Sequence, residues 1–161
     1  MESLYACCLL WALGFTNGES YADALHSSFR DRPESPTLFA LEEAFPDAGR
    51  SLSLLEAACT AEGSNFSQAA FAKALFTGLH AVHTENHFAL PIFGQKCYAL
   101  WKALPSSLRD QEPFLTLSYA QDPLLGETKT TCVLIWRQLS SRPAGKRPAV
   151  GHWPSLAPIH P

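Results

Sequence analysis

Branched aliphatic residues are scarce in this sequence: three Val and three Ile stand against 23 Leu and 22 Ala in 161 residues. Strands favour Val and Ile, whereas Leu and Ala lose little side-chain entropy in a helix. The composition therefore disfavours a β-sheet protein, and we expect an all-α fold. Hydrophobic residues make up 47% of the chain, which is too many for a chain that is disordered throughout.

An excess of basic residues is also missing, because the formal net charge is -3. Proteins that bind nucleic acid carry a strong positive footprint, so we expect no specific nucleic-acid binding. The charge is unevenly distributed: residues 1–62 contain ten acidic and three basic side chains. This acidic first third could face a basic partner, or it could be an ordinary solvated surface.

Local signatures of catalysis and of cofactor binding are absent from the sequence. There is no glycine-rich phosphate loop, no Cys-x-x-Cys pair and no Gly-x-Ser-x-Gly elbow. Glu42 and Glu43 are adjacent, so on a helix they point to different sides and do not form an acid–base pair. We therefore predict no catalytic residue and no cofactor, and a metal-dependent or hydrolytic enzyme is the third interpretation of function.

The most distinctive polar pattern is formed by His80, His83 and His87. Spacings of three and four residues place these side chains on one helix face, where they could share a metal ion. A zinc site needs a fourth ligand or a water molecule, and no residue in the sequence is designated for that position. We favour a solvent-facing or packed histidine face and predict no metal site.

An uncharged apolar run covers residues 4–15. A membrane-spanning helix needs about 20 residues, so we predict no membrane span. The run is typical either of a buried helix or of the apolar part of a secretory signal peptide within residues 1–18. Asn65-Phe66-Ser67 also has two interpretations, a helix N-cap or a glycosylation acceptor in a secreted protein.

The five cysteines, at positions 7, 8, 59, 97 and 132, show no paired framework. Cys8, Cys59 and Cys97 fall on predicted apolar helix faces, where cysteine acts as a small hydrophobic residue. These features favour a reducing compartment. The protein is therefore predicted to be cytoplasmic or nuclear, with secretion as the alternative.

Recurring start and stop signals divide residues 1–139 into eight or nine short helices. Apolar stripes with helical spacing predict helices over residues 2–15, 35–45, 65–87 and 93–104. The second helix is predicted to start with Ser35 as N-cap and Pro36 as first residue, and its stripe is Leu38, Leu41 and Phe45. The stripe of the third helix is Phe71, Leu75, Leu79 and Val82.

Ser20 with Asp23 and Ser53 with Glu56 resemble capping boxes, and Ser51 is an alternative start for the second of these helices. Gly63 is predicted to end that helix in the left-handed conformation, and Asn65 is predicted to cap the next helix.

Two signals define the C-terminal part of the chain. Asp122-Pro123 resembles an N-cap followed by proline, and it predicts a last helix that runs through Val133 and Trp136 to Leu139. Residues 140–161 contain five Pro and three basic side chains, which predicts a disordered tail. The expected organisation is a helical domain over residues 1–139 followed by a disordered, Pro-rich basic tail over residues 140–161.

The Leu-rich, Ala-filled segments 51–61, 65–87 and 93–104 resemble units of armadillo- or HEAT-type helical arrays. Residues 69–101 also resemble large vertebrate helical-repeat proteins of the meiosis inhibitor type. The resemblance implies an irregular helical bundle or a short α-solenoid that presents a binding surface to a protein partner.

The leading interpretation is a non-catalytic helical module for protein–protein interaction, whose partner the sequence does not identify. Such a module could be a piece of a larger helical-repeat scaffold, because the predicted first helix is apolar nearly all round, as an internal repeat would be. The alternative is a small secreted helical protein with a cleaved N-terminal signal peptide.

Overall fold

The computed structural model describes residues 1–86 and 88–120, and within these ranges every regular element is a helix. The all-α prediction is thus confirmed for the described residues. The α-helices are α1 (Glu2–Ala12), α2 (Glu19–Asp31), α3 (Pro36–Ala44), α4 (Ala48–Glu62), α5 (Gln68–Asn86), α6 (Leu90–Ala103) and α7 (Ser106–Arg109). Two 3-10 helices are η1 (Gly63–Asn65) and η2 (Phe114–Tyr119). The predicted last helix, to Leu139, and the predicted tail, residues 140–161, lie outside the described residues.

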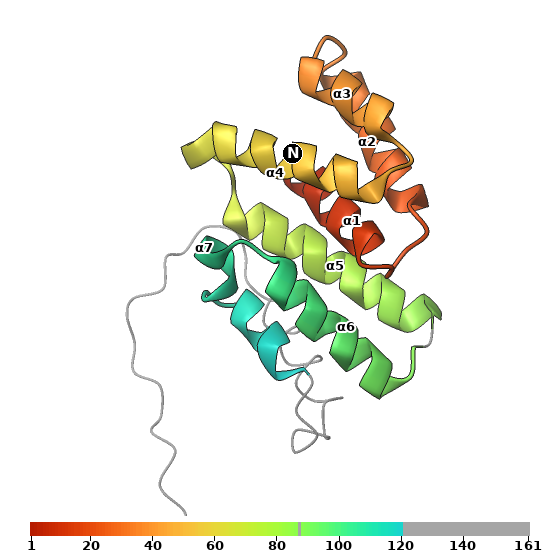
Figure 1. Ribbon diagram of the computed structural model, residues 1–161, viewed down its shortest axis with the longest axis vertical. Coiled ribbons are helices and arrows are strands. Elements are labelled where there is room, and N and C mark those ends of the chain that lie inside the picture. The colour runs from red at the N-terminus through yellow and green to blue at the C-terminus, as the bar shows by residue number, and fades with distance from the viewer. Residues whose placement is uncertain (87, 121–161) are drawn as a thin grey trace, which may run out of the picture.

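Helix α1 lies between α2, α4 and α5 and packs against all three (Figure 1). Its buried side chains are Leu4, Tyr5, Ala6, Cys8, Leu9 and Leu10. Burial of each large apolar side chain stabilises the fold by about 1.5–3 kcal/mol, which accounts for the apolar character of the helix on nearly every side. Within the described ranges, no helix combines the length and apolar composition that a membrane crossing requires.

The helices are stacked in layers along the long axis of the molecule (Figure 1). The α2–α3 pair forms one end, α4 and α1 follow, then α5, and α6 with α7 and η2 forms the other end. Aromatic contacts join the last layer to α5, since the Phe114 ring centroid lies 5.7 Å from that of Phe71 and 6.3 Å from that of Phe76. A single cluster of buried side chains therefore extends from α1 through α5 to η2.

Lys96 of α6 forms hydrogen bonds with the C-terminal end of α1. Its Nζ donates hydrogen bonds to the carbonyl oxygens of Leu13, at 3.1 Å, and Gly14, at 2.9 Å. The same ammonium group lies 5.3 Å from the ring centroid of Phe15 and 5.5 Å from that of Phe88. A cation at the C-terminal end of a helix is favourable, because the last carbonyl groups carry partial negative charge.

The predicted capping box at the start of α2 is wrong. The helix begins at Glu19, directly after Gly18, which has φ 93°. Ser20 and Asp23 therefore both lie inside the helix. The side-chain oxygen of Asn17 accepts the backbone N–H of Glu19 at 3.2 Å, so the polar contact at this end comes from before the helix.

The predicted start of α4 is also wrong. Asp47 is the N-cap, and its Oδ1 accepts the backbone N–H of Arg50 at 3.0 Å. Ser53 lies in the helix interior, where its hydroxyl donates to the carbonyl oxygen of Gly49 at 3.0 Å. Ser51 lies inside the helix as well, and it is fully buried.

The residue that caps α5 is Ser67, not Asn65. The Ser67 hydroxyl oxygen accepts the backbone N–H of Ala70 at 3.3 Å, whereas Asn65 lies in η1. Gly63 ends α4 with a φ of 54°, but its ψ of -114° lies outside the left-handed helical region that was predicted for it. The 3-10 turn after Gly63 delays the start of α5 by two residues relative to the prediction.

Candidate functional site

The predicted histidine face is described only in part, because His87 lies outside the described residues. His83 is half-buried, its ring centroid lies 4.9 Å from that of Phe93, and its Nδ1 has no hydrogen-bond partner among the described residues. His80 is exposed on α5. Among the residues that the structure describes, no group of three or more His, Cys, Asp or Glu side chains is arranged to hold a metal ion. His83 thus packs between α5 and α6.

The cysteines predicted on apolar faces are buried to different degrees. Cys8 and Cys97 are buried and Cys59 is half-buried, whereas Cys132 lies outside the described residues. Burial raises the pKa of Cys8 to about 12 and also raises the pKa of half-buried Cys7. A raised pKa keeps a thiol protonated at neutral pH, so Cys7 and Cys8 are poorly suited to nucleophilic chemistry.

An exposed aromatic side chain lies between acidic residues on α3. Phe39 is 53% exposed, and its ring centroid lies 5.5 Å from that of half-buried Phe29 on α2. Glu42 and Glu43 are both exposed, and their spacings of three and four residues place them one helical turn after Phe39, one on each flank of its side chain. The Glu43 carboxylate pairs with the Arg50 guanidinium at 3.7 Å. We refer to Phe29, Phe39, Glu42 and Glu43 as the Phe39 surface.

A second group of aromatic rings fixes the α2–α3 pair on α1. The Trp11 ring stacks on Tyr21, with centroids 5.3 Å apart, and lies 5.5 Å from Phe45. Tyr21 is fully buried, whereas Phe45, predicted on the apolar stripe of its helix, is 42% exposed. These contacts hold the Phe39 surface in a fixed position relative to the rest of the molecule.

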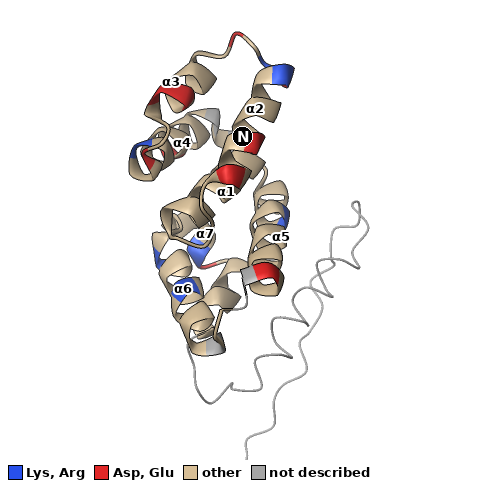
Figure 2. Cartoon of the chain, turned by 90° about the vertical axis from the view of Figure 1, so that its right-hand side faces the viewer, with Lys and Arg blue, Asp and Glu red and all other residues tan. Residues whose placement is uncertain are grey.

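Charge is separated along the molecule (Figure 2). Residues 1–62, which form α1 to α4, contain ten acidic and three basic side chains, whereas residues 63–120 contain three acidic and four basic ones. The Phe39 surface lies in the acidic part. Attraction of a positively charged partner to this end of the molecule follows from the excess of carboxylates.

A groove of about 570 Å³ lies between the C-terminal half of α1, the α1–α2 loop and α5. Its apolar lining consists of Leu10, Phe15, Ala74, Gly78, Ala81, Val82 and Phe88. At Gly78 the Leu10 side chain of α1 packs directly against the α5 backbone, because a Cβ there would lie 2.5 Å from Leu10 Cδ1. Two exposed carboxylates, Glu19 and Glu85, also line the groove. We refer to it as the α1–α5 groove.

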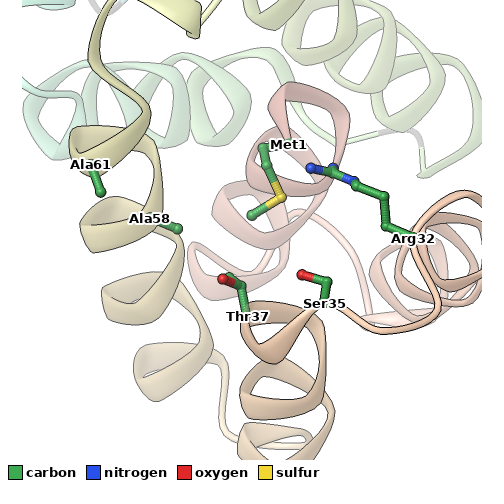
Figure 3. A pocket seen from close by; sticks show the side chains of 6 residues that line it. All are labelled: Met1, Arg32, Ser35, Thr37, Ala58 and Ala61. Atoms are coloured by element: carbon green, nitrogen blue, oxygen red, sulfur yellow. The ribbon is translucent and has the colours of Figure 1, made fainter.

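A smaller pocket of about 230 Å³ lies between the start of α1, the α2–α3 loop and α4. The side chains of Met1, Arg32, Ser35 and Thr37 converge on it, opposite two alanines of α4 (Figure 3). Arg32 is the one charged side chain among its described lining residues. The pocket therefore offers hydrogen-bond donors but, in its described lining, no carboxylate, imidazole or thiol.

Comparison of the chain with protein-family models, with curated proteins and with solved structures finds no match. The Phe39 surface and the α1–α5 groove are therefore the features on which a functional proposal must depend.

Phe39 is not among the residues that we predicted to be functional, although the sequence contains a signal for it. Leu38 and Leu41 are both fully buried and define the inner stripe of α3. Phe39 lies outside that stripe, so helical spacing alone places it on the outer face. A large aromatic residue on an outer face next to two carboxylates is the pattern that indicates a binding surface.

Proposed function

We propose that this chain is a non-catalytic protein–protein interaction module whose Phe39 surface binds a basic segment of a partner protein. The observation that carries the proposal is the 53% exposure of Phe39 on a helix whose inner face is fully packed. Aromatic side chains surrounded by a polar rim dominate the binding free energy of many protein interfaces. Glu42 and Glu43 provide such a rim.

The packing beneath Phe39 supports this role. Leu38 and Leu41 fix α3 in the core, and the Phe29 ring supports the Phe39 ring from α2. A surface that is already ordered loses little conformational entropy when it binds. The module therefore does not have to reorganise before a partner can dock.

The surrounding charge favours a basic partner. Residues 19–62 contain nine acidic and three basic side chains. The ion pair between Glu43 and Arg50 is exposed at both ends, and such surface pairs contribute little free energy. Arg50 can therefore be displaced by a Lys or Arg of the partner, and the attraction between opposite charges accelerates association at low salt.

The architecture that we propose for the module is an irregular helical bundle. Stacked helices support the likeness to armadillo- and HEAT-type arrays, as do the contacts of α3 with its neighbours α2 and α4. In an array each repeat contacts its neighbours in sequence, whereas α1 packs against α5, and three α-helices separate the two along the chain. A contact of this kind is typical of a bundle.

The proposal is tested by affinity capture with the immobilised full chain. Phe39→Ala and Tyr119→Ala each remove an aromatic ring that is 53% exposed, the first on the acidic end and the second on η2. We expect a basic protein to be retained by the wild-type chain and by Tyr119→Ala, to be lost with Phe39→Ala, and to dissociate as salt is raised. Retention of the same proteins by all three chains would refute the proposal.

A further inference from the structure

We propose that residues 129–139 of this chain dock as a helix in the α1–α5 groove. These residues lie outside the described residues, and the predicted last helix includes them. The proposal does not depend on the Phe39 surface, which lies on α2 and α3.

The shape of the groove suits one face of a helix. Ala74 and Ala81 are seven positions apart, so they share a face of α5, and their small side chains leave room above it. Gly78 lies between them, and the Leu10 side chain packs against it. Phe15 and Phe88 add apolar lining from outside α5. Small residues on one helix let the large side chains of a second helix approach closely.

The segment carries the side chains that this groove would bury. Within a helix, Val133 and Trp136 share one face, and Lys129 and Arg137 lie on that same face. The two basic residues are eight positions apart, which corresponds to about 12 Å along a helix. An apolar centre with a cation at each end therefore matches an apolar lining that also contains carboxylates.

The carboxylates of the groove supply the complementary charge. Glu19 and Glu85 are exposed, and neither has an ion-pair partner among the described residues. Lys96, the nearby cation, is already bound to the carbonyl oxygens of Leu13 and Gly14. A basic occupant is thus favoured over an acidic one.

A linker joins the described part of the chain to the proposed helix. Eight residues separate Ala120, the last described residue, from Lys129. An extended segment of this length spans about 30 Å. The radius of gyration of a compact body of this size is about 14 Å, so the extended linker is about twice as long as that radius.

The test is photo-crosslinking of the full chain at low concentration, with p-benzoylphenylalanine in place of Val133. We expect adducts within one chain that map to residues 74–88 or 10–20. The same group in place of Val150, beyond the proposed helix, should give none of these adducts. Adducts between two chains would show that a second copy occupies the groove and would overturn the proposal, and so would the absence of groove adducts.

Two sets of variants control this experiment. Ala81→Arg fills the groove and should abolish the adducts, whereas Ala70→Arg places the same side chain on an exposed part of α5 and should retain them. If the Ala81→Arg variant loses its helical circular dichroism, a pair of charge-reversal variants is used in its place. Glu85→Lys and Arg137→Glu should each lower the adduct yield, and the double variant should restore it. The proposal would be refuted if the adducts persist in Ala81→Arg, or if neither charge reversal changes the adduct yield.

Discussion

Gly18 lies directly against the indole ring of Trp11, because a Cβ at residue 18 would lie 2.9 Å from Nε1 and Cε2 of that ring. Gly18 also has φ 93°, a conformation that residues with side chains rarely adopt. Gly18→Ala therefore strains the backbone and displaces Trp11 from its stack on Tyr21. We expect it to lower the free energy of unfolding by about 1–3 kcal/mol in urea denaturation.

The matched control for this prediction is Gly49→Ala in α4. A Cβ at residue 49 would meet only the Asp47 Oδ1 atom within 4 Å, at 3.4 Å. Alanine is the better helix former by about 1 kcal/mol, so the stability should stay the same or rise. Equal losses of unfolding free energy in the two variants would show that the contact with Trp11 is not the reason why glycine is required at residue 18.

Lys96→Met should destabilise the protein by about 1–3 kcal/mol, because the carbonyl oxygens of Leu13 and Gly14 lose a charged donor. Methionine keeps most of the aliphatic packing, so the loss reports the ammonium group, through its hydrogen bonds and its contacts with the Phe15 and Phe88 rings. Lys102→Met is the control, since Lys102 is exposed and lies 5.8 Å from the Tyr98 ring centroid. Its effect in chemical denaturation should stay within about 0.5 kcal/mol, and a larger loss for Lys102 than for Lys96 would contradict the structure.

Asp47→Ala should cost about 1 kcal/mol of unfolding free energy, because the backbone N–H of Arg50 loses its acceptor. Ser53→Ala should change stability by less than about 0.5 kcal/mol, because Ser53 is exposed within the helix. The two variants separate the cap that the structure places from the cap that the sequence predicts. A greater loss in Ser53→Ala would favour the start of α4 that the sequence predicts.

The free energy of unfolding should fall at alkaline pH, because a buried thiol and two buried phenol groups stay protonated in the folded state. Burial raises the pKa of Cys8 from about 9 to about 12, and it also raises the pKa values of Tyr5 and Tyr21. The folded state therefore keeps protons that the unfolded chain releases. The stabilisation is complete below pH 9 and is lost progressively as the pH rises towards 12.

Urea denaturation at a series of pH values measures this effect. The unfolding free energy of the wild-type chain should fall above pH 9, and Cys8→Ala should reduce that slope by up to about 1.4 kcal/mol per pH unit. The slopes are compared rather than the absolute stabilities, because removing the thiol also leaves a cavity. An identical slope in both chains would show that Cys8 ionises equally in the folded and unfolded states.

The positions of the helices could be predicted from the sequence because helical periodicity is a local signal. Phe71, Leu75, Leu79 and Val82 were predicted to form one stripe of α5, and all four are buried. The predicted proline start of α3 also holds, since Ser35 is its N-cap and Pro36 its first residue. Each of these features depends only on residues within one helix.

The helix caps were predicted less well, because Ser and Asn act as caps only where the helix actually ends. Ser53 has the spacing of a capping box, yet its hydroxyl is satisfied inside α4 by the Gly49 carbonyl oxygen. The outer position of Phe39 on α3 could have been predicted from helical spacing. Its contact with Phe29 and the α1–α5 groove could not, because both depend on which helices pack together, and that information is not local.

Binding of a basic partner at the Phe39 surface is best tested by photo-crosslinking in living cells. The probe is p-benzoylphenylalanine in place of Phe39, compared with the same group in place of Tyr119. Both side chains are 53% exposed, so both probes are equally accessible. We expect the probe at residue 39, and not the probe at residue 119, to capture a protein through a segment rich in Lys or Arg. Identical captures at both positions, or a captured segment without basic residues, would contradict it.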